Sequence, residues 1–228
     1  MGVQPLPVGT FSLQLERVRQ QALLWQGMAL AERVFSGALL LVLLPLLIAV
    51  TFVIIALSRR SPLIAHQRIG QRGRPIWVLK FRTMWDRSSQ CRNCMALVER
   101  LSSDFSAAIN LKNREDPRVT SRFAAVCRRY SIDELPQLWH VFRGEMRLIG
   151  PRPLTAQEIE TYYSSAADEL LSIKPGISGL WQIRGRSRLS YVQRRRLDLF
   201  LVRNWSLRLY VKILIATPRT VLAGKHAW

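Results

Sequence analysis

Residues Val34 to Leu57 read VFSGALLLVLLPLLIAVTFVIIAL, and this stretch decides the fold because it contains no charged residue. A straight helix over these 24 positions would be roughly 36 Å long, enough to cross a hydrocarbon core of roughly 30 Å. A cleavable signal peptide would begin earlier in the chain and have a shorter apolar core. A soluble domain of this size could hardly cover such a helix on all sides. The stretch therefore predicts a helix embedded in a membrane.

The path of this helix through the membrane depends on Pro45 and on the charges at both ends. Pro45 lies near the middle of the stretch, where a proline removes one backbone hydrogen bond and kinks a helix. Arginines flank the stretch on both sides, namely Arg17, Arg19 and Arg33 before it and Arg59, Arg60, Arg68, Arg72 and Arg74 after it. Basic flanks favour the cytoplasmic side. A re-entrant helix bent at Pro45 satisfies both flanks, and a tilted single span is the alternative.

The remaining chain divides into an N-terminal arm over 1–33 and a cytoplasmic domain over 58–228. In the arm, apolar residues recur at alternating steps of four and three, namely Phe11, Leu15, Val18, Ala22 and Trp25. This stripe predicts an amphipathic helix at the membrane interface, and a mobile arm is the alternative. The large domain is predicted to be mainly α with few short strands, an α+β fold. Its expected elements are a short strand or an extended interfacial segment over 76–82, a helix from about Ser131 that ends at Gly144, and helices over 92–112, 155–172, 188–202 and 210–222.

The charge and the cysteine content restrict the kinds of partner and of cysteine site that the protein can have. Lys and Arg number 34 against 15 Asp and Glu, which gives a net charge of +19 and favours polyanionic partners such as nucleic acid, anionic lipid or phosphorylated substrates. Three cysteines argue against a disulfide framework. Cys91 and Cys94 form a C-x-x-C pair without a second pair at zinc-site spacing, so two incidental thiols are favoured over a zinc site.

The residues richest in chemistry are Ser131-Ile-Asp-Glu-Leu-Pro-Gln137. Pro136 is well tolerated only in the first turn of a helix, which places Asp133 and Glu134 at a helix N-terminus. The unpaired N–H groups and the dipole at such an end favour phosphate. Ser131 and Glu134 also have the spacing of a capping box, so a purely structural role for the acids is an open alternative.

Arginines at glycine- and proline-containing turns surround this segment and favour phosphate chemistry. The turns are Asp116-Pro-Arg118, Gly150-Pro-Arg-Pro153, Lys174-Pro-Gly-Ile-Ser-Gly179 and Gly185-Arg186. Rigid turns that carry guanidinium groups are suited to cradle phosphates. A carboxylate can attack phosphorus to form an acyl phosphate, and a second carboxylate can hold Mg²⁺.

Several motifs, in the same order, closely resemble the bacterial sugar transferases, the monotopic polyprenyl-phosphate phosphoglycosyl transferases. The matching segments are Lys80-Phe-Arg-Thr-Met84, Asp116-Pro-Arg-Val-Thr120, Ser131 to Leu138, Gly144-Glu-Met146, Gly150 to Pro153, and Lys174 to Gln182. The resemblance runs from about residue 31 to the end of the chain. The segments from Gly179 to Ser187 and from Val202 to Leu207 look most like the branch that transfers galactose- or glucose-phosphate in exopolysaccharide synthesis.

This resemblance implies a reaction, a cofactor and a site. It implies that Asp133 forms a covalent sugar-phosphate adduct with loss of UMP from a UDP-sugar, and that polyprenyl phosphate then attacks the adduct. It implies that Mg²⁺ is required and that Asp133 and Glu134 hold it. It also implies a re-entrant helix broken at the proline that matches Pro45. Charge and motif together assign substrate binding to Lys80, Arg82, Arg118, Arg152, Gln182 and Arg186.

The same resemblance implies a bacterial inner membrane location, with the catalytic domain on the cytoplasmic face. It leaves the oligomeric state open, a dimer included, and it implies no nucleic-acid partner. Three positions depart from the family pattern: Leu44 stands where Ser is usual, His140 where Asn is common and Arg147 where Ser is common. A membrane-tethered binding protein and a non-catalytic assembly partner are the rival hypotheses, and the intact Asp133–Glu134 pair speaks against the second.

Overall fold

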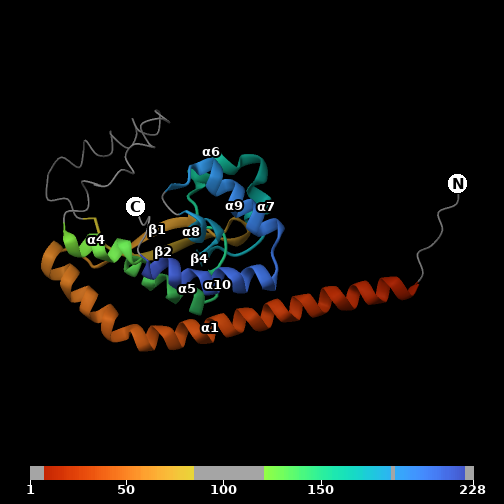
Figure 1. The fold of residues 1–228 in the computed structure, drawn as a ribbon, viewed down its shortest axis with the longest axis horizontal. Helices are drawn as coiled ribbons and strands as arrows, with labels where there is room; N and C mark the ends of the chain where they lie inside the picture. Colours follow the sequence, from red (N-terminus) through yellow and green to blue (C-terminus); the bar gives the residue numbers. More distant parts are fainter. Residues whose placement is uncertain (1–7, 85–120, 186–187, 224–228) are drawn as a thin grey trace.

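The computed structural model describes residues 8–84, 121–185 and 188–223 and shows a helical domain seated on one long helix (Figure 1). Strands are few and short, so the predicted mainly helical α+β fold is confirmed. The predicted helix over 92–112 and the Cys91–Cys94 pair lie outside the described residues.

The long helix α1 spans Val8–Ser58, so the N-terminal arm and the apolar stretch form one continuous helix. Over Ala22–Ser58 it is long and apolar enough to cross a membrane. Leu41 and Val42 are 73% and 74% exposed, which leaves an apolar surface that the rest of the protein does not cover. The helix contains Pro45 and bends in its C-terminal part (Figure 1). Its re-entrant course and the interfacial position of the arm remain predictions.

A two-stranded hairpin follows α1. Strands β1 (Leu63–Ile69) and β2 (Pro75–Phe81) pair antiparallel, and the short 3₁₀ turn η1 (Gln71–Gly73) connects them. This confirms the strand predicted over 76–82. Its partner β1 was not predicted, because most of its residues are exposed and it lacks the alternation of buried and exposed positions that marks a half-buried strand.

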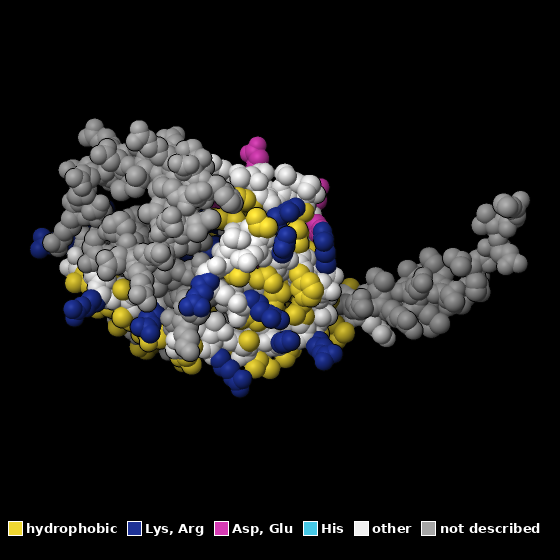
Figure 2. Space-filling model, turned by 45° about the horizontal axis from the view of Figure 1, so that its top comes forward, with side chains coloured by type: hydrophobic (Ala, Val, Ile, Leu, Met, Phe, Trp, Pro, Cys, Tyr) yellow, Lys and Arg dark blue, Asp and Glu magenta, His cyan; other side chains and the backbone are white. Residues whose placement is uncertain are grey.

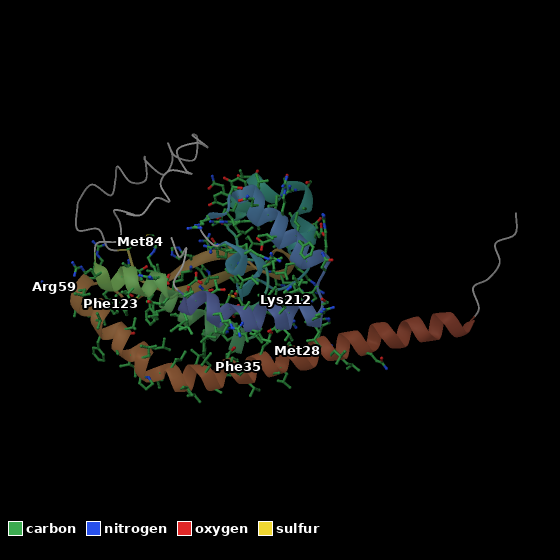
Figure 3. All side chains as sticks on the ribbon, viewed as in Figure 1. Met28, Phe35, Arg59, Met84, Phe123 and Lys212 are labelled. Carbon is green, nitrogen blue, oxygen red and sulfur yellow. The ribbon has the colours of Figure 1, made fainter. Side chains whose placement is uncertain are left out.

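Three short elements pack between the hairpin and α1. They are helix α4 (Arg122–Arg129), the 3₁₀ turn η2 (Ile132–Gln137) and helix α5 (Leu138–Phe142). An apolar cluster joins α1, β2, α4 and η2, and its members are Val50, Ile54, Phe81, Ala124 and Ile132. Figure 3 shows Phe123 of α4 near Arg59 at the end of α1. At α5, a Cβ on Gly37 would lie 3.0 Å from the Phe142 ring, so a glycine permits this close packing of α1 and α5.

The C-terminal half covers the other side of the hairpin. Strands β3 (Arg147–Ile149) and β4 (Gly176–Ser178) pair in parallel. Around them lie α6 (Ala156–Tyr163), η3 (Ser164–Ala166), α7 (Ala167–Leu170), α8 (Leu180–Arg184), α9 (Tyr191–Arg203) and α10 (Leu207–Leu222). The helices predicted over 155–172, 188–202 and 210–222 are confirmed, the first one interrupted at η3. Side chains of Thr155, Ser190 and Ser206 cap α6, α9 and α10, which explains where these helices begin.

Candidate active site

The acidic pair lies in the first turn of η2, directly after a strained residue. Ser131 has φ +55° and ψ +26°, the left-handed region that a residue with a side chain seldom adopts. Its side chain does not cap η2, so the capping box suggested by the Ser131–Glu134 spacing is not formed. Pro136 lies inside the turn, as expected, but the turn is 3₁₀ rather than α-helical. A helix cap therefore does not account for Asp133 and Glu134.

Lys80 is the residue that the fold brings to the acidic pair. Its Nζ lies 2.6 Å from Oε1 of Glu134, and both side chains are about three-quarters buried, with 21% and 26% exposed. A charge-assisted hydrogen bond at this distance is strong. Lys80 lies near the end of β2, whereas Glu134 lies in η2. The hairpin thus fixes one carboxylate of the pair and leaves the neighbouring Asp133 beside a cation.

The environment of Asp133 is suited to a carboxylate that must be both ionised and reactive. The pKa of Asp133 is raised to about 6, first by burial and then by the negative charge of Glu134, against the opposing charges of Lys80 and Arg128. At pH 7 the group is therefore mainly a carboxylate. It is less solvated than an exposed aspartate, and weak solvation favours nucleophilic attack.

A second cluster of cations lies at and near Trp181, the second residue of α8. The guanidinium carbon of Arg152 lies 5.4 Å from the Trp181 ring centre, and that of Arg194 lies 4.8 Å from it. Arg68 of β1 is 3.4 Å from Glu158. Burial lowers the pKa of Arg68 and of Arg194, and the charge of Arg152 lowers both further. The charge of Glu158 opposes both shifts and that of Asp198 opposes the shift of Arg194, so these carboxylates offset part of the positive charge. The remaining positive charge is suited to an anionic group of a substrate.

A row of basic side chains links the two clusters along one face of the hairpin. Lys80 pairs with Ile64, His66 with Val78 and Arg68 with Ile76, so Lys80, His66 and Arg68 point to the same side. Burial lowers the pKa of His66, and the charges of Arg68 and Lys80 on the same face lower it further. Four residues of strand separate the two ends, or roughly 13 Å.

His140, one of the departures from the family pattern, supports this face. Its Nε2 accepts a hydrogen bond from the backbone N–H of Leu79 at 3.1 Å, so Nε2 carries no proton and Nδ1 donates to Oε2 of Glu145 at 2.7 Å. The ring is buried between α5 and β2. The substitution thus replaces one hydrogen-bonding side chain by another. His140 holds β2 against α5 at Leu79, the residue before Lys80.

The other predicted binding residues have different outcomes. Arg152 belongs to the Trp181 cluster, and Gln182 follows Trp181, with its Nε2 3.4 Å from the carbonyl oxygen of Ile177. Nε of Arg82 donates to the carbonyl oxygen of Ser61 at 2.7 Å, at the base of the hairpin. Arg118 and Arg186 lie outside the described residues. Sequence reasoning missed Arg68 and Arg194, although the run Arg194–Arg196 was a visible signal.

Two adjacent carboxylates can hold Mg²⁺ only with help from other oxygen ligands. The described residues contain no group of three or more side chains able to ligate a metal. Mg²⁺ commonly binds one or two carboxylates and completes its shell with water and substrate phosphates. Asp133 and Glu134 fit this pattern, because they are neighbours, half-buried and adjacent to a cationic face suited to phosphates.

The family described as "Bacterial sugar transferase" matches residues 26–224. The chain is 38% identical over 195 residues to a "UDP-galactose-lipid carrier transferase" of Erwinia amylovora, covering 84% of this chain and 40% of that protein. It is 37% identical over 194 residues to the "Exopolysaccharide production protein ExoY" of Rhizobium meliloti, covering 85% of this chain and 84% of that protein.

A third relative is the "Undecaprenyl-phosphate galactose phosphotransferase" of Salmonella typhimurium, 38% identical over 167 residues, with 72% of this chain and 34% of that protein covered. The chain thus spans well under half the length of the Erwinia and Salmonella relatives and most of the length of the Rhizobium one. The family match includes the second half of α1, the hairpin, η2 and the Trp181 cluster. By this match and these relatives, the chain belongs to the bacterial sugar transferases, a family of enzymes.

Proposed function

We propose that this protein transfers a hexose-1-phosphate from a UDP-sugar to polyprenyl phosphate, with release of UMP. The observation that carries the proposal is the position of Asp133 and Glu134. The pair lies beside Lys80, on a turn whose Ile132 packs against Val50 and Ile54 of the apolar helix α1. A lipid phosphate at the membrane surface and a soluble nucleotide can therefore both reach one carboxylate. The names of the relatives support galactose or glucose as the sugar.

In the first half of the reaction, a carboxylate oxygen of Asp133 attacks the phosphorus that bears the sugar. The bond between this phosphorus and the bridging oxygen breaks, and UMP leaves with the electron pair. In the second half, an oxygen of polyprenyl phosphate attacks the same phosphorus, and the Asp133 carboxylate is released. Two displacements split one difficult transfer into two easier steps.

Other residues bind and orient the substrates in this scheme. Lys80 fixes Glu134 and offers its charge to the diphosphate. The row through His66 and Arg68 leads to Trp181, where Arg152 and Arg194 can hold the remote part of the nucleotide. Bound Mg²⁺, held by Asp133 and Glu134, would neutralise charge on the diphosphate and on the leaving group.

The same proposal includes a topology. The bend of α1 in its C-terminal part (Figure 1), the presence of Pro45 inside the helix and the basic flanks support a helix that enters and leaves by the cytoplasmic face of the bacterial inner membrane. Figure 2 shows Lys and Arg side chains distributed over the visible face of the domain, with Asp and Glu confined to its upper part. Such a surface is attracted to an anionic leaflet.

An intact-mass measurement tests the reaction. The purified protein in nanodiscs is mixed with UDP-galactose, UDP-glucose and other UDP-sugars in the presence of Mg²⁺ and without lipid acceptor. We expect one of them to add the mass of a hexose phosphate, with release of one UMP, and polyprenyl phosphate to remove the adduct. If none of these UDP-sugars produces the adduct or releases UMP, only the binding-protein and assembly-partner hypotheses remain.

The pH dependence of adduct formation should reveal the environment of Asp133. Because its pKa is about 6, the rate is expected to fall as the pH decreases through about 6, where the carboxylate becomes protonated. Lys80→Met removes a cation that lowers this pKa, so the acid limb should move to higher pH. Arg208→Met, an exposed change on α10, is the control. An acid limb that stays at the same pH in Lys80→Met would contradict the assigned role of Lys80.

A further inference from the structure

A cavity of about 330 Å³ lies between α1 and the turn that joins α5 to β3, away from the acidic pair. Its charged lining residues are Glu32 and Arg33 of α1, Arg143 and Arg147 of the turn and β3, and Lys174 before β4. Figure 3 labels Met28 and Phe35, which bracket this part of α1 below α10. Four cationic side chains thus face a single carboxylate in a space large enough for a small ligand.

The cations are held in place by the backbone of the turn. Nε of Arg33 donates to the carbonyl oxygen of Phe142 at 2.9 Å, and Nζ of Lys174 donates to that of Gly144 at 2.7 Å. Gly144 has φ +77°, a conformation that favours glycine and allows the turn to present these carbonyl oxygens. The charged groups are therefore positioned before any ligand arrives.

Arg147 is the least solvated of the cations, with 11% of its side chain exposed. Its Nη2 donates to the carbonyl oxygen of Trp25 at 3.0 Å, and its Nε lies 3.7 Å from Oε2 of Glu32. The Tyr210 hydroxyl also donates to Glu32. Nη1 of Arg147 is buried without a hydrogen-bond partner among the described residues. The guanidinium carbon of Arg147 lies 5.2 Å from the Trp25 ring centre and 5.8 Å from that of Trp205, so these rings hold Arg147 as a fixed positive charge beside the cavity.

Repulsion among these charges is not relieved by Glu32 alone. Burial lowers the pKa of Lys174, and the charges of Arg147 and Arg33 lower it further against the opposite effect of Glu32. Arg143 pairs with Glu145 at 2.9 Å and remains 57% exposed, so it lies at the mouth rather than in the interior. An anion with several acceptor oxygens would accept hydrogen bonds from the remaining N–H groups of Arg33 and Lys174 and reduce the repulsion.

The position of the cavity along α1 indicates where the anion comes from. Arg33 directly precedes Val34, the first residue of the uncharged stretch, so the cavity lies at the level where lipid headgroups begin. Leu30, which also lines it, is 62% exposed, and Val34 and Phe35 beyond it are exposed as well. The exposed apolar side chains and the cations of the cavity match the acyl chains and the charged headgroup of an anionic phospholipid.

We propose that this cavity binds the phosphate group of an anionic phospholipid and thereby attaches α1 to the catalytic domain at the membrane surface. The site is separate from the one for polyprenyl phosphate, and it rests on the membrane attachment in the proposed function but not on the transfer reaction. The lipid phosphate accepts hydrogen bonds from Arg33 and Lys174 near the fixed charge of Arg147, and the acyl chains lie along the exposed side of α1.

Native mass spectrometry of the full chain tests the proposal. The protein is released from phosphatidylcholine nanodiscs that contain increasing fractions of phosphatidylglycerol, and the fraction that retains one phosphatidylglycerol is measured. A parallel series uses phosphatidylcholine alone with inorganic phosphate. We expect retention of one phosphatidylglycerol, about tenfold weaker in Lys174→Gln, as is typical for the loss of a charged hydrogen bond, and weaker to a smaller extent in Arg143→Gln.

Two further variants exclude misfolding and unspecific attraction. Glu32→Gln keeps an acceptor for Tyr210 but removes the negative charge, so it should retain the lipid more tightly, a gain that misfolding cannot produce. Arg208→Gln removes an equal charge outside the cavity and should have no effect. Equal losses in Arg208→Gln and Lys174→Gln, weaker retention in Glu32→Gln, or retention of free phosphate without lipid would each overturn the proposal. Asp133→Asn, which is expected to abolish transfer, should retain the lipid, so the two proposals fail separately.

Discussion

Asp133→Asn is expected to reduce transfer by ~10⁴-fold or more, as is usual when a covalent nucleophile is removed, and to abolish the sugar-phosphate adduct. The amide has the shape of the carboxylate but cannot displace UMP from phosphorus. Since Asp133 is half-buried next to Glu134 and Lys80, loss of its negative charge should not destabilise the turn. The measurement is UMP release together with intact mass, with the protein in nanodiscs.

Two companion variants make this result interpretable. Asp168→Asn is the same chemical change at an exposed position at the start of α7, and full activity is expected. Glu134→Gln removes the partner of Lys80, and we expect traces of activity and slow formation of the adduct, because Asp133 is still present. Full activity in Asp133→Asn would exclude a covalent mechanism at this residue.

Gly176→Ala is expected to destabilise the domain by about 4 kcal/mol or more, among the largest effects of single substitutions. A Cβ at this position would lie 2.1 Å from the backbone nitrogen of Gly150 and 2.5 Å from the carbonyl carbon of Ile149. These are backbone atoms of the paired strand β3, so no side-chain rotation relieves the overlap. The strands must separate, and the Gly150–Pro153 turn that carries Arg152 moves with them.

Thermal unfolding of the purified protein measures this effect, and the midpoint should fall on the order of 10 °C. Gly27→Ala is the matched control, since no heavy atom lies within 4 Å of the added Cβ. Gly27 lies inside α1, where alanine is the better helix former, so the control should be neutral or slightly stabilising. An unfolding midpoint of Gly176→Ala equal to that of the parent protein would contradict the packing described for β3 and β4.

The elements that were predictable from the sequence are those set by local composition. The apolar helix needs only an uncharged run of sufficient length, and helices α6, α9 and α10 carry a capping side chain at their start. Asp133 and Glu134 stood out because Pro136 restricts their turn. Strand β1 was missed because its residues are mostly exposed, so its pairing with β2 leaves no alternation in the sequence.

The contacts of the site could not be predicted in this way. Lys80 and Glu134 are 54 positions apart, and their 2.6 Å contact depends on how the hairpin packs against η2. Arg194 meets Trp181 only because α8 and α9 pack together. The sequence also allowed Ser131 to cap a helix, and only its left-handed backbone in the folded protein excludes that role.

By itself, the sequence determined that the stretch from Val34 to Leu57 is apolar and long enough for a membrane and that two acids meet at a turn, since both properties depend on neighbouring residues. The tertiary structure alone decided that Lys80 fixes Glu134, that Arg152 and Arg194 meet at Trp181, and that cations line a cavity beside Arg33. Such groupings depend on strand register and helix packing, which bring distant residues together and which no local pattern records.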